Sequence, residues 1–301
     1  MRCILLYNPN SGKGKLHKKL PYIQKKLREK FDEVVVQTTS STEDFEHRVR
    51  MSAEEYDCVL FSGGDGTFHH VIQALRGKRA SLGYLPSGTV NDVARSLKIP
   101  RTVRGALKVI LKGEPQNLDC MEVNGSQYAM YIAAAGAFTR ATYATPQNKK
   151  RLFGALAYAV EAVLHDLKLQ VFPLKIECGE QTLETHAVLI LVMNGTSVAG
   201  FPLNRKGSMT DGKLEIAVIR QVKRPNFFQK IGALFSVASL FVFGCKIKKR
   251  DVAFFSGEEV RIRTSEDVVW DFDGEEGIRG NARIELLSGR VNMIVPKNKK
   301  I

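Results

Sequence analysis

CVLFSGGDGT, residues 58–67, is the stretch of sequence that decides the fold. Residues 58–61 form an unbroken apolar run, as expected for a strand that is buried on both faces. Three glycines follow within four positions, and a helical pattern then continues to about residue 75. A buried strand, a glycine-rich turn and a helix in this order are typical of one unit of a parallel α/β layer.

The same unit recurs on both sides of this stretch. Further strands are predicted over residues 3–7, 34–37 and 82–85, and helical patterns over residues 16–31, around 45–51 and over 93–97. Glycine-rich turns over residues 8–15 and 86–92 follow the first and the last of these strands. The alternation predicts an α/β domain with a parallel sheet over residues 1–120, with ligands at the carboxyl ends of its strands.

The pattern becomes mostly β after residue 120. Two helical stretches interrupt it, at about residues 150–167 and 226–243. The predicted strands are 127–134, 174–178, 187–193, 214–219, 259–264, 268–272, 282–287 and 291–295. We therefore expect a second, β-rich domain over residues 121–287, with the last segment, about 288–301, packing back on the first domain.

Asp65 is the feature of the central turn that a purely structural role explains least well. It lies among Gly63, Gly64 and Gly66, whose missing side chains let a ligand approach the backbone. Backbone N–H groups at such a turn suit a phosphate, and a carboxylate beside a phosphate is repulsive unless a cation lies between them. Mg²⁺ would supply that cation. The alternative is that Asp65 only caps the next helix.

The two flanking turns are ambiguous when each is taken alone. Residues 8–15, NPNSGKGK, could hold a phosphate, but the spacing of a Walker A loop is absent. In the other turn Thr89 and Asn91 could contact a nucleotide, whereas Asp92 could simply cap the following helix.

An acidic turn closes one strand of the second domain. Residues 270–276 read WDFDGEE, and the repulsion among four carboxylates must be offset by a cation or by solvent. Without further information an ordinary acidic hairpin turn is the simpler interpretation.

Together these motifs resemble those of a known family. Residues 8–12, 63–67 and 86–92 resemble the NPxSG, GGDGT and PxGTxND motifs of the diacylglycerol kinase catalytic-domain family, which includes sphingosine and ceramide kinases. Residues 273–275 match its C-terminal Asp-Gly-Glu motif, and the soluble bacterial members are the most similar. The resemblance runs along nearly the whole chain. It implies a two-domain kinase whose first domain is NAD-kinase/phosphofructokinase-like, with the active site in the cleft, and transfer of the γ-phosphate of ATP to a lipid hydroxyl, from diacylglycerol to phosphatidic acid.

The resemblance also implies the site residues. Glu275 would be the proton acceptor, with Asp273 as second candidate; Asp65 and Asp119 would hold a catalytic Mg²⁺ through water. Ser208, Asp211 and Lys213 would bind a structural Mg²⁺, although Asp-Gly is also an ordinary hairpin turn. ATP would contact Asn8, Pro9, Asn10, Ser11, Gly12, Thr39, Gly64, Asp65, Gly66, Thr67, Phe68, His69, His70, Thr89 and Asn91.

The chain departs from the family at two of these positions. Members often carry Asn-Glu where this chain has His69-His70. The two histidines could contact phosphate or could be helix-surface residues without a role.

The charge of the chain points to an anionic partner. Lys and Arg exceed Asp and Glu by 14, a surplus that favours nucleic acid, phosphate ligands or an acidic lipid surface. Residues 227–245 are apolar and are followed by four basic residues, which suits interfacial binding to anionic lipid as well as a core helix. We expect a cytoplasmic protein that associates peripherally with an anionic membrane, uses ATP and Mg²⁺, and could form a homodimer.

Other functions remain open at this point. A NAD kinase shares the GGDGT loop, but the other two turns disfavour it. A nucleic-acid-binding protein would explain the charge, yet no helix-turn-helix, RNP-type strand or zinc spacing is present. Within the lipid kinases the acceptor could also be a sphingoid base, a monoacylglycerol or a polyprenol.

Overall fold

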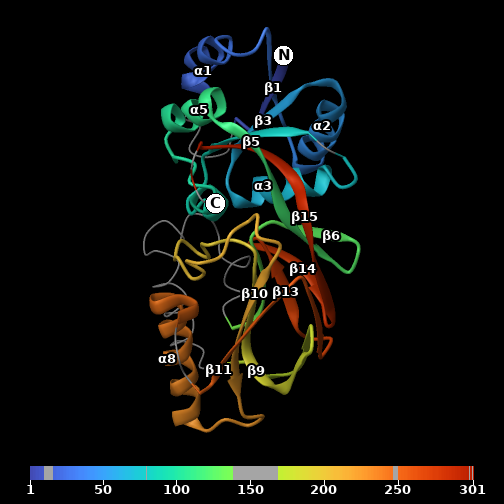
Figure 1. Ribbon diagram of the computed structural model, residues 1–301, viewed down its shortest axis with the longest axis vertical. Coiled ribbons are helices and arrows are strands. Elements are labelled where there is room, and N and C mark those ends of the chain that lie inside the picture. Colours follow the sequence, from blue (N-terminus) through green and yellow to red (C-terminus); the bar gives the residue numbers. More distant parts are fainter. Residues whose placement is uncertain (10–15, 79, 138–168, 247–249, 298, 300) are drawn as a thin grey trace. The chain divides into compact units, whose positions relative to one another are not determined.

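The computed structural model describes residues 1–9, 16–78, 80–137, 169–246, 250–297, 299 and 301. The chain forms two compact units. The first comprises Met1–Cys120 together with Leu287–Ile301, and the second is Met121–Leu286 (Figure 1).

A parallel sheet forms the centre of the first unit. Its strands follow the order β4-β3-β1-β2, and each neighbouring pair is parallel. All side chains of β3 are buried, which accounts for its unbroken apolar run. The strands are β1 (Arg2–Tyr7), β2 (Glu33–Thr38), β3 (Cys58–Gly63) and β4 (Ser81–Pro86).

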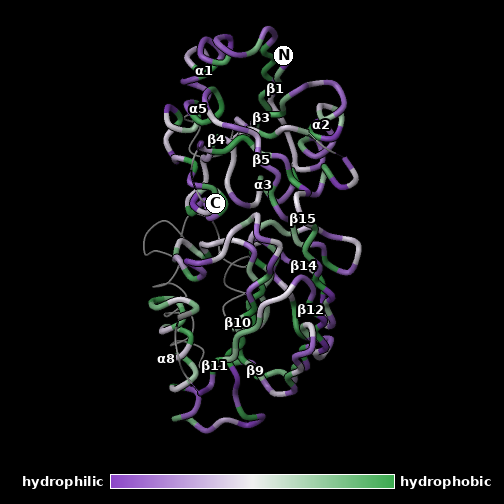
Figure 2. Tube along the Cα trace, viewed as in Figure 1, coloured by the Kyte–Doolittle hydropathy of each residue, from purple (hydrophilic) through white to green (hydrophobic). Residues whose placement is uncertain are grey.

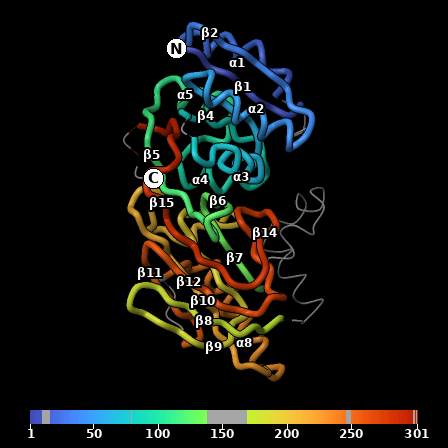
Figure 3. The backbone as a smooth tube through the Cα atoms, turned by 90° about the vertical axis from the view of Figure 1, so that its right-hand side faces the viewer, coloured from blue at the N-terminus to red at the C-terminus, as the bar shows by residue number. Residues whose placement is uncertain are grey.

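Helices pack on this sheet (Figure 3). The predicted helix over residues 16–31 is wrong in its length, because a 3₁₀ turn precedes it and Pro21, which lacks an N–H, fits only the first turn of a helix. The helix over 103–112, which the sequence did not suggest to us, buries Ala106, Leu107, Val109 and Ile110. The elements are η2 (His17–Lys19), α1 (Leu20–Leu27), α2 (Thr42–Glu55), α3 (Asp65–Ala74), α4 (Asp92–Ser96) and α5 (Val103–Lys112).

Two long strands, β5 (Glu114–Val123) and β15 (Ala282–Val295), contribute to both units. In the first unit Met293 of β15 pairs in parallel with Leu82 of β4, and the Asn292 side chain donates to Asn117 of β5 at 2.9 Å. The strands predicted over 282–287 and 291–295 are one continuous strand, β15. Gly289 lies within the strand with a φ of 62°.

The second unit is mostly β and antiparallel. Its central path follows the order β14-β13-β7-β9-β8-β12, with β10 pairing β9 and β11. The strand predicted over 127–134 is two strands, and the helix predicted at about 150–167 lies outside the described residues. The strands are β6 (Gln127–Ala129), β7 (Ile132–Gly136), β8 (Phe172–Cys178), β9 (Gln181–Met193), β10 (Leu214–Gln221), β11 (Val252–Gly257), β12 (Glu259–Thr264), β13 (Val269–Phe272) and β14 (Glu275–Arg279).

One apolar cluster, which includes Phe172 and Trp270, forms the core of this unit. The helix α8 (Phe227–Phe243) packs beside β10, and a 3₁₀ turn, η3 (Gly244–Lys246), follows it. Figure 2 shows that α8 and β10 are both predominantly hydrophobic. Among the described residues, no helix is both long enough and apolar enough to cross a membrane.

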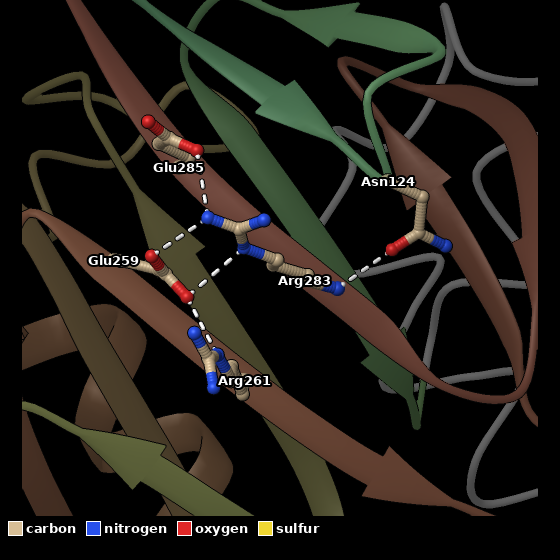
Figure 4. A network of polar contacts seen from close by, with 5 residues as sticks. All are labelled: Asn124, Glu259, Arg261, Arg283 and Glu285. Atoms are coloured by element: carbon tan, nitrogen blue, oxygen red, sulfur yellow. Dashed lines mark hydrogen bonds and ion pairs between the residues drawn. The ribbon is translucent and has the colours of Figure 1, made fainter.

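A polar network joins β12 and β15 on the surface of the second unit (Figure 4). The Arg283 guanidinium binds both carboxylate oxygens of Glu259 at 3.0 Å, and Arg261 donates to the same carboxylate at 2.7 Å. Arg283 also reaches Glu285 at 3.1 Å, and its backbone N–H donates to Asn124 at 2.7 Å. The hydrogen bonds from Arg283 and Arg261 hold the pKa of Glu259 below its usual value.

Replacing Arg283 with Gln should therefore lower Tm slightly at neutral pH, by a few degrees at most, because exposed ion pairs contribute little. The lowered pKa of Glu259 stabilises the fold above the unfolded pKa, and this contribution is lost as the pH falls through the folded pKa. The Tm difference from the unmodified protein should thus disappear between about pH 5 and about pH 3. If the Tm difference persisted at acidic pH, the role given to the Arg283–Glu259 ion pair would be wrong. The control is Arg279→Gln, which removes a longer ion pair, of 3.5 Å, with Glu276.

Candidate active site

The strands of the first unit bring its polar turns to one edge of the sheet. In register, Tyr7 pairs with Thr38 and with Ser62, and Gly63 pairs with Pro86, so the carboxyl ends of four parallel strands are level. The residues after these ends are Asn8 and Pro9, Thr39, Gly64 and Ser87. Asn10, Ser11 and Gly12 of the first predicted turn lie outside the described residues.

The second and third turns contact each other backbone to backbone. The N–H groups of Ser87 and Gly88 both donate to the carbonyl of Gly63, at 2.8 and 3.3 Å. A Cβ on Gly88 would lie 2.5 Å from the Cα of Gly64, a distance that real Cβ atoms do not show. Only glycine fits here, and it leaves the backbone of both turns open to a ligand.

Asn91 and Tyr84 support this contact with side-chain hydrogen bonds. Asn91 is buried in a left-handed conformation, with φ 55°. Its side chain accepts from the Gly88 N–H at 3.0 Å and donates to the Gly88 carbonyl at 2.8 Å. The Tyr84 hydroxyl donates to the Gly63 carbonyl at 3.1 Å. Asn91 was predicted to contact ATP, but its amide is used within the turn.

Tyr84 is fully buried between aromatic neighbours. Its ring stacks on Phe61 at 5.0 Å and meets Phe68 edge-on at 5.4 Å. Burial, together with the charge of Asp65, raises the pKa of the Tyr84 hydroxyl well above its usual value. The phenol therefore stays protonated and remains a hydrogen-bond donor to the turn. Sequence reasoning missed Tyr84, because within its strand it reads as an ordinary core residue.

Asp65 is the first residue of α3, and its carboxylate accepts from the Val93 N–H of α4 at 3.1 Å. Figure 3 shows α3 and α4 side by side. The capping role that was the alternative for Asp65 is thus present, although the capped helix is α4 rather than its own. This role does not exclude an ion, because a carboxylate has about four acceptor positions.

The first turn of α3 provides backbone N–H groups beside the two glycine turns. Gly64 caps the helix, and Gly66 and Thr67 follow Asp65 within it. A helix N-terminus with free N–H groups and partial positive charge is a ready site for phosphate. Thr89, in the third turn, is exposed. This arrangement fits an anionic, phosphate-bearing ligand.

The aromatic and imidazole side chains predicted to contact ATP point to other partners. Phe68 is fully buried in the core, so only its backbone is available to a ligand. The His70 ring pairs with Glu46 of α2 at 2.8 Å, and the His69 ring contacts Gln73 at 3.2 Å.

Asp119, the second predicted carboxylate of the Mg²⁺ site, lies buried on β5. It accepts from the N–H of Gly289 at 2.9 Å, a residue of β15. Across the described part of the chain, His, Cys, Asp and Glu do not form a cluster of three or more that could hold a metal ion. Mg²⁺ does not require one, because it commonly takes one or two carboxylates together with phosphate oxygens.

The carboxylates of the acidic turn in the second unit differ in burial and in hydrogen bonding. Asp273 is buried and has φ 57°. Its carboxylate accepts three backbone N–H groups, from Met130 at 2.6 Å, Tyr131 at 2.9 Å and Ile132 at 3.2 Å. This carboxylate therefore fixes the turn on the start of β7.

Glu275 and Asp271 complete this turn. Glu275 is only partly buried, and among the described residues its carboxylate has neither a hydrogen bond nor an ion pair. Asp271 is buried and accepts from the Gly274 N–H at 2.9 Å. Of the two predicted proton acceptors, Glu275 is therefore the one that is available, and Asp273 and Asp271 hold the turn that presents it.

The predicted structural-metal loop is also ordered by its own contacts. Ser208 is buried and bonds Thr210 at 2.9 Å, and Asp211 accepts from the Lys213 N–H at 3.2 Å. Nearby, Asn204 donates to Glu215 at 2.6 Å. Burial raises the pKa of Glu215 to about 7, against the opposing effect of that hydrogen bond.

Comparison with known proteins places these features in a family. Residues 2–123 match the model of the diacylglycerol kinase catalytic domain. Residues 132–295 match that of the YegS C-terminal NAD kinase beta sandwich-like domain.

Full-length relatives agree with this division. A diacylglycerol kinase of Bacillus subtilis is 29% identical over 303 residues, covering 99% of this chain and 97% of the relative. One from Staphylococcus aureus is 28% identical over 301 residues, with 99% and 93% coverage. A Bacillus anthracis crystal structure, provisionally described as a diacylglycerol kinase, superposes with a TM-score of 0.83 at 26% identity, covering 98% of this chain and 97% of that one.

The two domain matches together span most of the chain, and the glycine turns and the acidic turn each lie within one of them. The chain therefore belongs to the diacylglycerol kinase catalytic-domain family of lipid kinases.

Proposed function

We propose that this protein transfers the γ-phosphate of ATP to the free hydroxyl of diacylglycerol, giving phosphatidic acid. The observation that carries the proposal is the backbone contact of Gly64 with Gly88 at the N-terminus of α3, beside Asp65. Family membership supports a kinase of lipids, and the names of the full-length relatives support diacylglycerol as the acceptor.

The first unit would bind the nucleotide through its backbone. The open backbone of the two glycine turns and the N–H groups of the first turn of α3 suit the phosphates of ATP. Thr89 and the residues after β1 and β2 would supply further contacts. Mg²⁺, when bound, would neutralise charge on these phosphates, and Asp65 and Asp119 would hold it through water.

The second unit would supply the general base. In the proposed reaction the hydroxyl oxygen of the acceptor forms a bond to the γ-phosphorus, and the bond from that phosphorus to the bridging oxygen breaks, releasing ADP. The hydroxyl proton passes to the carboxylate of Glu275, which has no competing hydrogen bond among the described residues. Asp273 is a positioning residue, because it anchors the turn through three backbone N–H groups.

A second Mg²⁺ is proposed at the loop of Ser208, Asp211 and Lys213. The loop is prefolded around these residues, and the Asp211 carboxylate keeps acceptor positions beyond the one that the Lys213 N–H uses. Its role would be structural, because a cation there would offset the negative charge of Asp211 beside the partly buried Glu215.

The activity itself is tested with labelled ATP, Mg²⁺ and a panel of acceptors in mixed micelles. We expect phosphorylation of diacylglycerol and little of a sphingoid base, a monoacylglycerol, a polyprenol or NAD. NAD belongs in the panel because the family of the second unit is named for its likeness to NAD kinase. Excess EDTA should abolish turnover. If another acceptor were preferred, diacylglycerol would be the wrong substrate. If turnover continued in EDTA, the role proposed for Asp65 in holding Mg²⁺ would be wrong.

Substitutions in the acidic turn distinguish residues with a catalytic role from residues with a structural one. Glu275→Gln should lower kcat by about 10²–10⁴-fold, because it keeps the shape and removes the base. Tm should not change. Glu276→Gln, the exposed neighbour, is the matched control and should keep wild-type kcat.

Asp273→Ala should behave differently, because it leaves buried backbone N–H groups without an acceptor, at a cost of about 1–3 kcal/mol for each group left unsatisfied. A clear fall in Tm is therefore expected together with the loss of activity. If Glu275→Gln retained wild-type kcat, the assignment of the base would be wrong.

Gly88→Ala tests the phosphate cradle. The added Cβ would lie 2.5 Å from the Gly64 Cα and 2.7 Å from the Asn91 Oδ1, so the turns must move apart. Because a displacement of about 1 Å at a site can cost about 10²-fold, we expect kcat/KM for ATP to fall by at least tenfold. Gly232→Ala, where a Cβ meets nothing within 4 Å, is the control. If Gly88→Ala and Gly232→Ala had equal kcat/KM for ATP, the proposal that the nucleotide binds at this turn would be wrong.

A further inference from the structure

The helix α8 is anchored to the second unit near each of its ends. At one end the Gln221 side chain of β10 donates to the Gln229 carbonyl at 2.8 Å, and Asn226 and Gln229 form a capping box with mutual hydrogen bonds of 2.9 Å. At the other end the Cys245 N–H donates to the Leu203 carbonyl at 2.8 Å, and Phe241 packs edge-on against Phe201 at 5.8 Å. These contacts fix which face of the helix is turned outward.

The outward face is apolar. Ala233, Ser236, Val237 and Leu240 are buried, whereas Phe228 is 79% exposed, Phe235 65% and Val242 55%. These three residues are spaced by seven, so they lie in one line along the helix; Phe227 and Phe243, at the two ends of the helix, are also exposed, by 58% and 62%. We call Phe228, Phe235 and Val242 the α8 ridge. The sequence left open whether this helix is a core element or an interfacial one, and the structure shows one buried face and one exposed apolar face.

The surroundings of the α8 ridge are basic. Between residues 216 and 250 the sequence contains eight Lys or Arg residues and no Asp or Glu, in a chain whose whole surplus is +14. Of the described basic residues, Lys223 and Arg224 are exposed just before α8, and Arg250 is exposed shortly after it. The ridge is therefore bordered by positive charge at both ends of the helix.

We propose that the α8 ridge is the surface by which the protein docks on an anionic bilayer, with α8 parallel to the membrane plane. The proposal rests on the proposed function, since a diacylglycerol acceptor resides in a bilayer. A helix of 17 residues is about 25 Å long, shorter than the hydrocarbon core of about 30 Å. An apolar face bordered by basic residues is the composition that binds at the interface. Charge complementarity selects an anionic bilayer over a second copy of this basic chain.

Vesicle binding tests the proposal without ATP or diacylglycerol. The full chain is sedimented with sucrose-loaded vesicles of phosphatidylcholine, with and without phosphatidylglycerol. Phe228→Gln with Phe235→Gln should weaken partitioning into the anionic vesicles at least about tenfold. Met51→Gln, which removes an apolar side chain of 52% exposure from α2, should not change partitioning.

Two further variants address charge and depth. Lys223→Gln with Arg224→Gln should weaken binding about fivefold for each residue, and Lys297→Gln with Lys299→Gln, also exposed, should not. Because the single native tryptophan, Trp270, is fully buried, Phe235→Trp adds an exposed reporter. Its emission should be quenched by brominated acyl chains, unlike that of Met51→Trp.

The outcomes are distinguishable from failure of the proposed function. Turnover of a dispersed short-chain diacylglycerol should be unchanged in the Phe228→Gln, Phe235→Gln variant, whereas vesicle binding falls. Wild-type sedimentation of that variant, or an unquenched Phe235→Trp, would overturn the docking surface whatever the substrate. If the variant instead converts a dimer into a monomer by analytical ultracentrifugation and still binds vesicles, a second copy covers the ridge, and the proposal is wrong.

Discussion

The contact between Gly64 and Gly88 is the constraint on which the candidate nucleotide site depends. Two turns that follow neighbouring strands can share one concavity only if their backbones touch, and any Cβ at Gly88 would prevent this. The carbonyl of Gly63 accepts the N–H groups of Ser87 and Gly88, which joins the two turns. Asn91 and Tyr84 hydrogen-bond to the two turns, and Asp65 joins the start of α3 to α4.

The carboxylates of the candidate site differ in whether backbone N–H groups donate to them. Asp273, Asp271 and Asp119 are buried, accept backbone N–H groups and hold segments together. Glu275 is partly buried, and its carboxylate has no such bond among the described residues. In each unit the chain thus surrounds a small number of available groups with residues whose polar atoms are already satisfied.

The sequence predicted the strand and turn pattern well because that pattern is local. Apolar runs such as residues 58–61 and glycines at strand ends identify β3 and its turn directly. Hydrogen bonds between segments that are distant in the sequence could not be predicted in this way. That Asp65 caps α4, that Asn91 folds back on its own turn, and that Asp271 supports the acidic turn all depend on partners that no spacing rule reveals. The continuous strand β15 was predicted as two strands, and Gly289 lies within it.

The discontinuous first unit has a consequence for the order in which the chain folds during synthesis. Its strand β4 pairs through Leu82 with Met293, a residue that follows the entire second unit. At about 5–20 residues per second, synthesis of Met121–Leu286 takes roughly 8–33 s, and throughout that time one edge of β4 lacks its partner. An unpaired strand edge invites association with other chains. The second unit, although later in the sequence, is continuous and can close first, whereas the nucleotide-binding unit is completed only when residues 287–295 emerge from the ribosome.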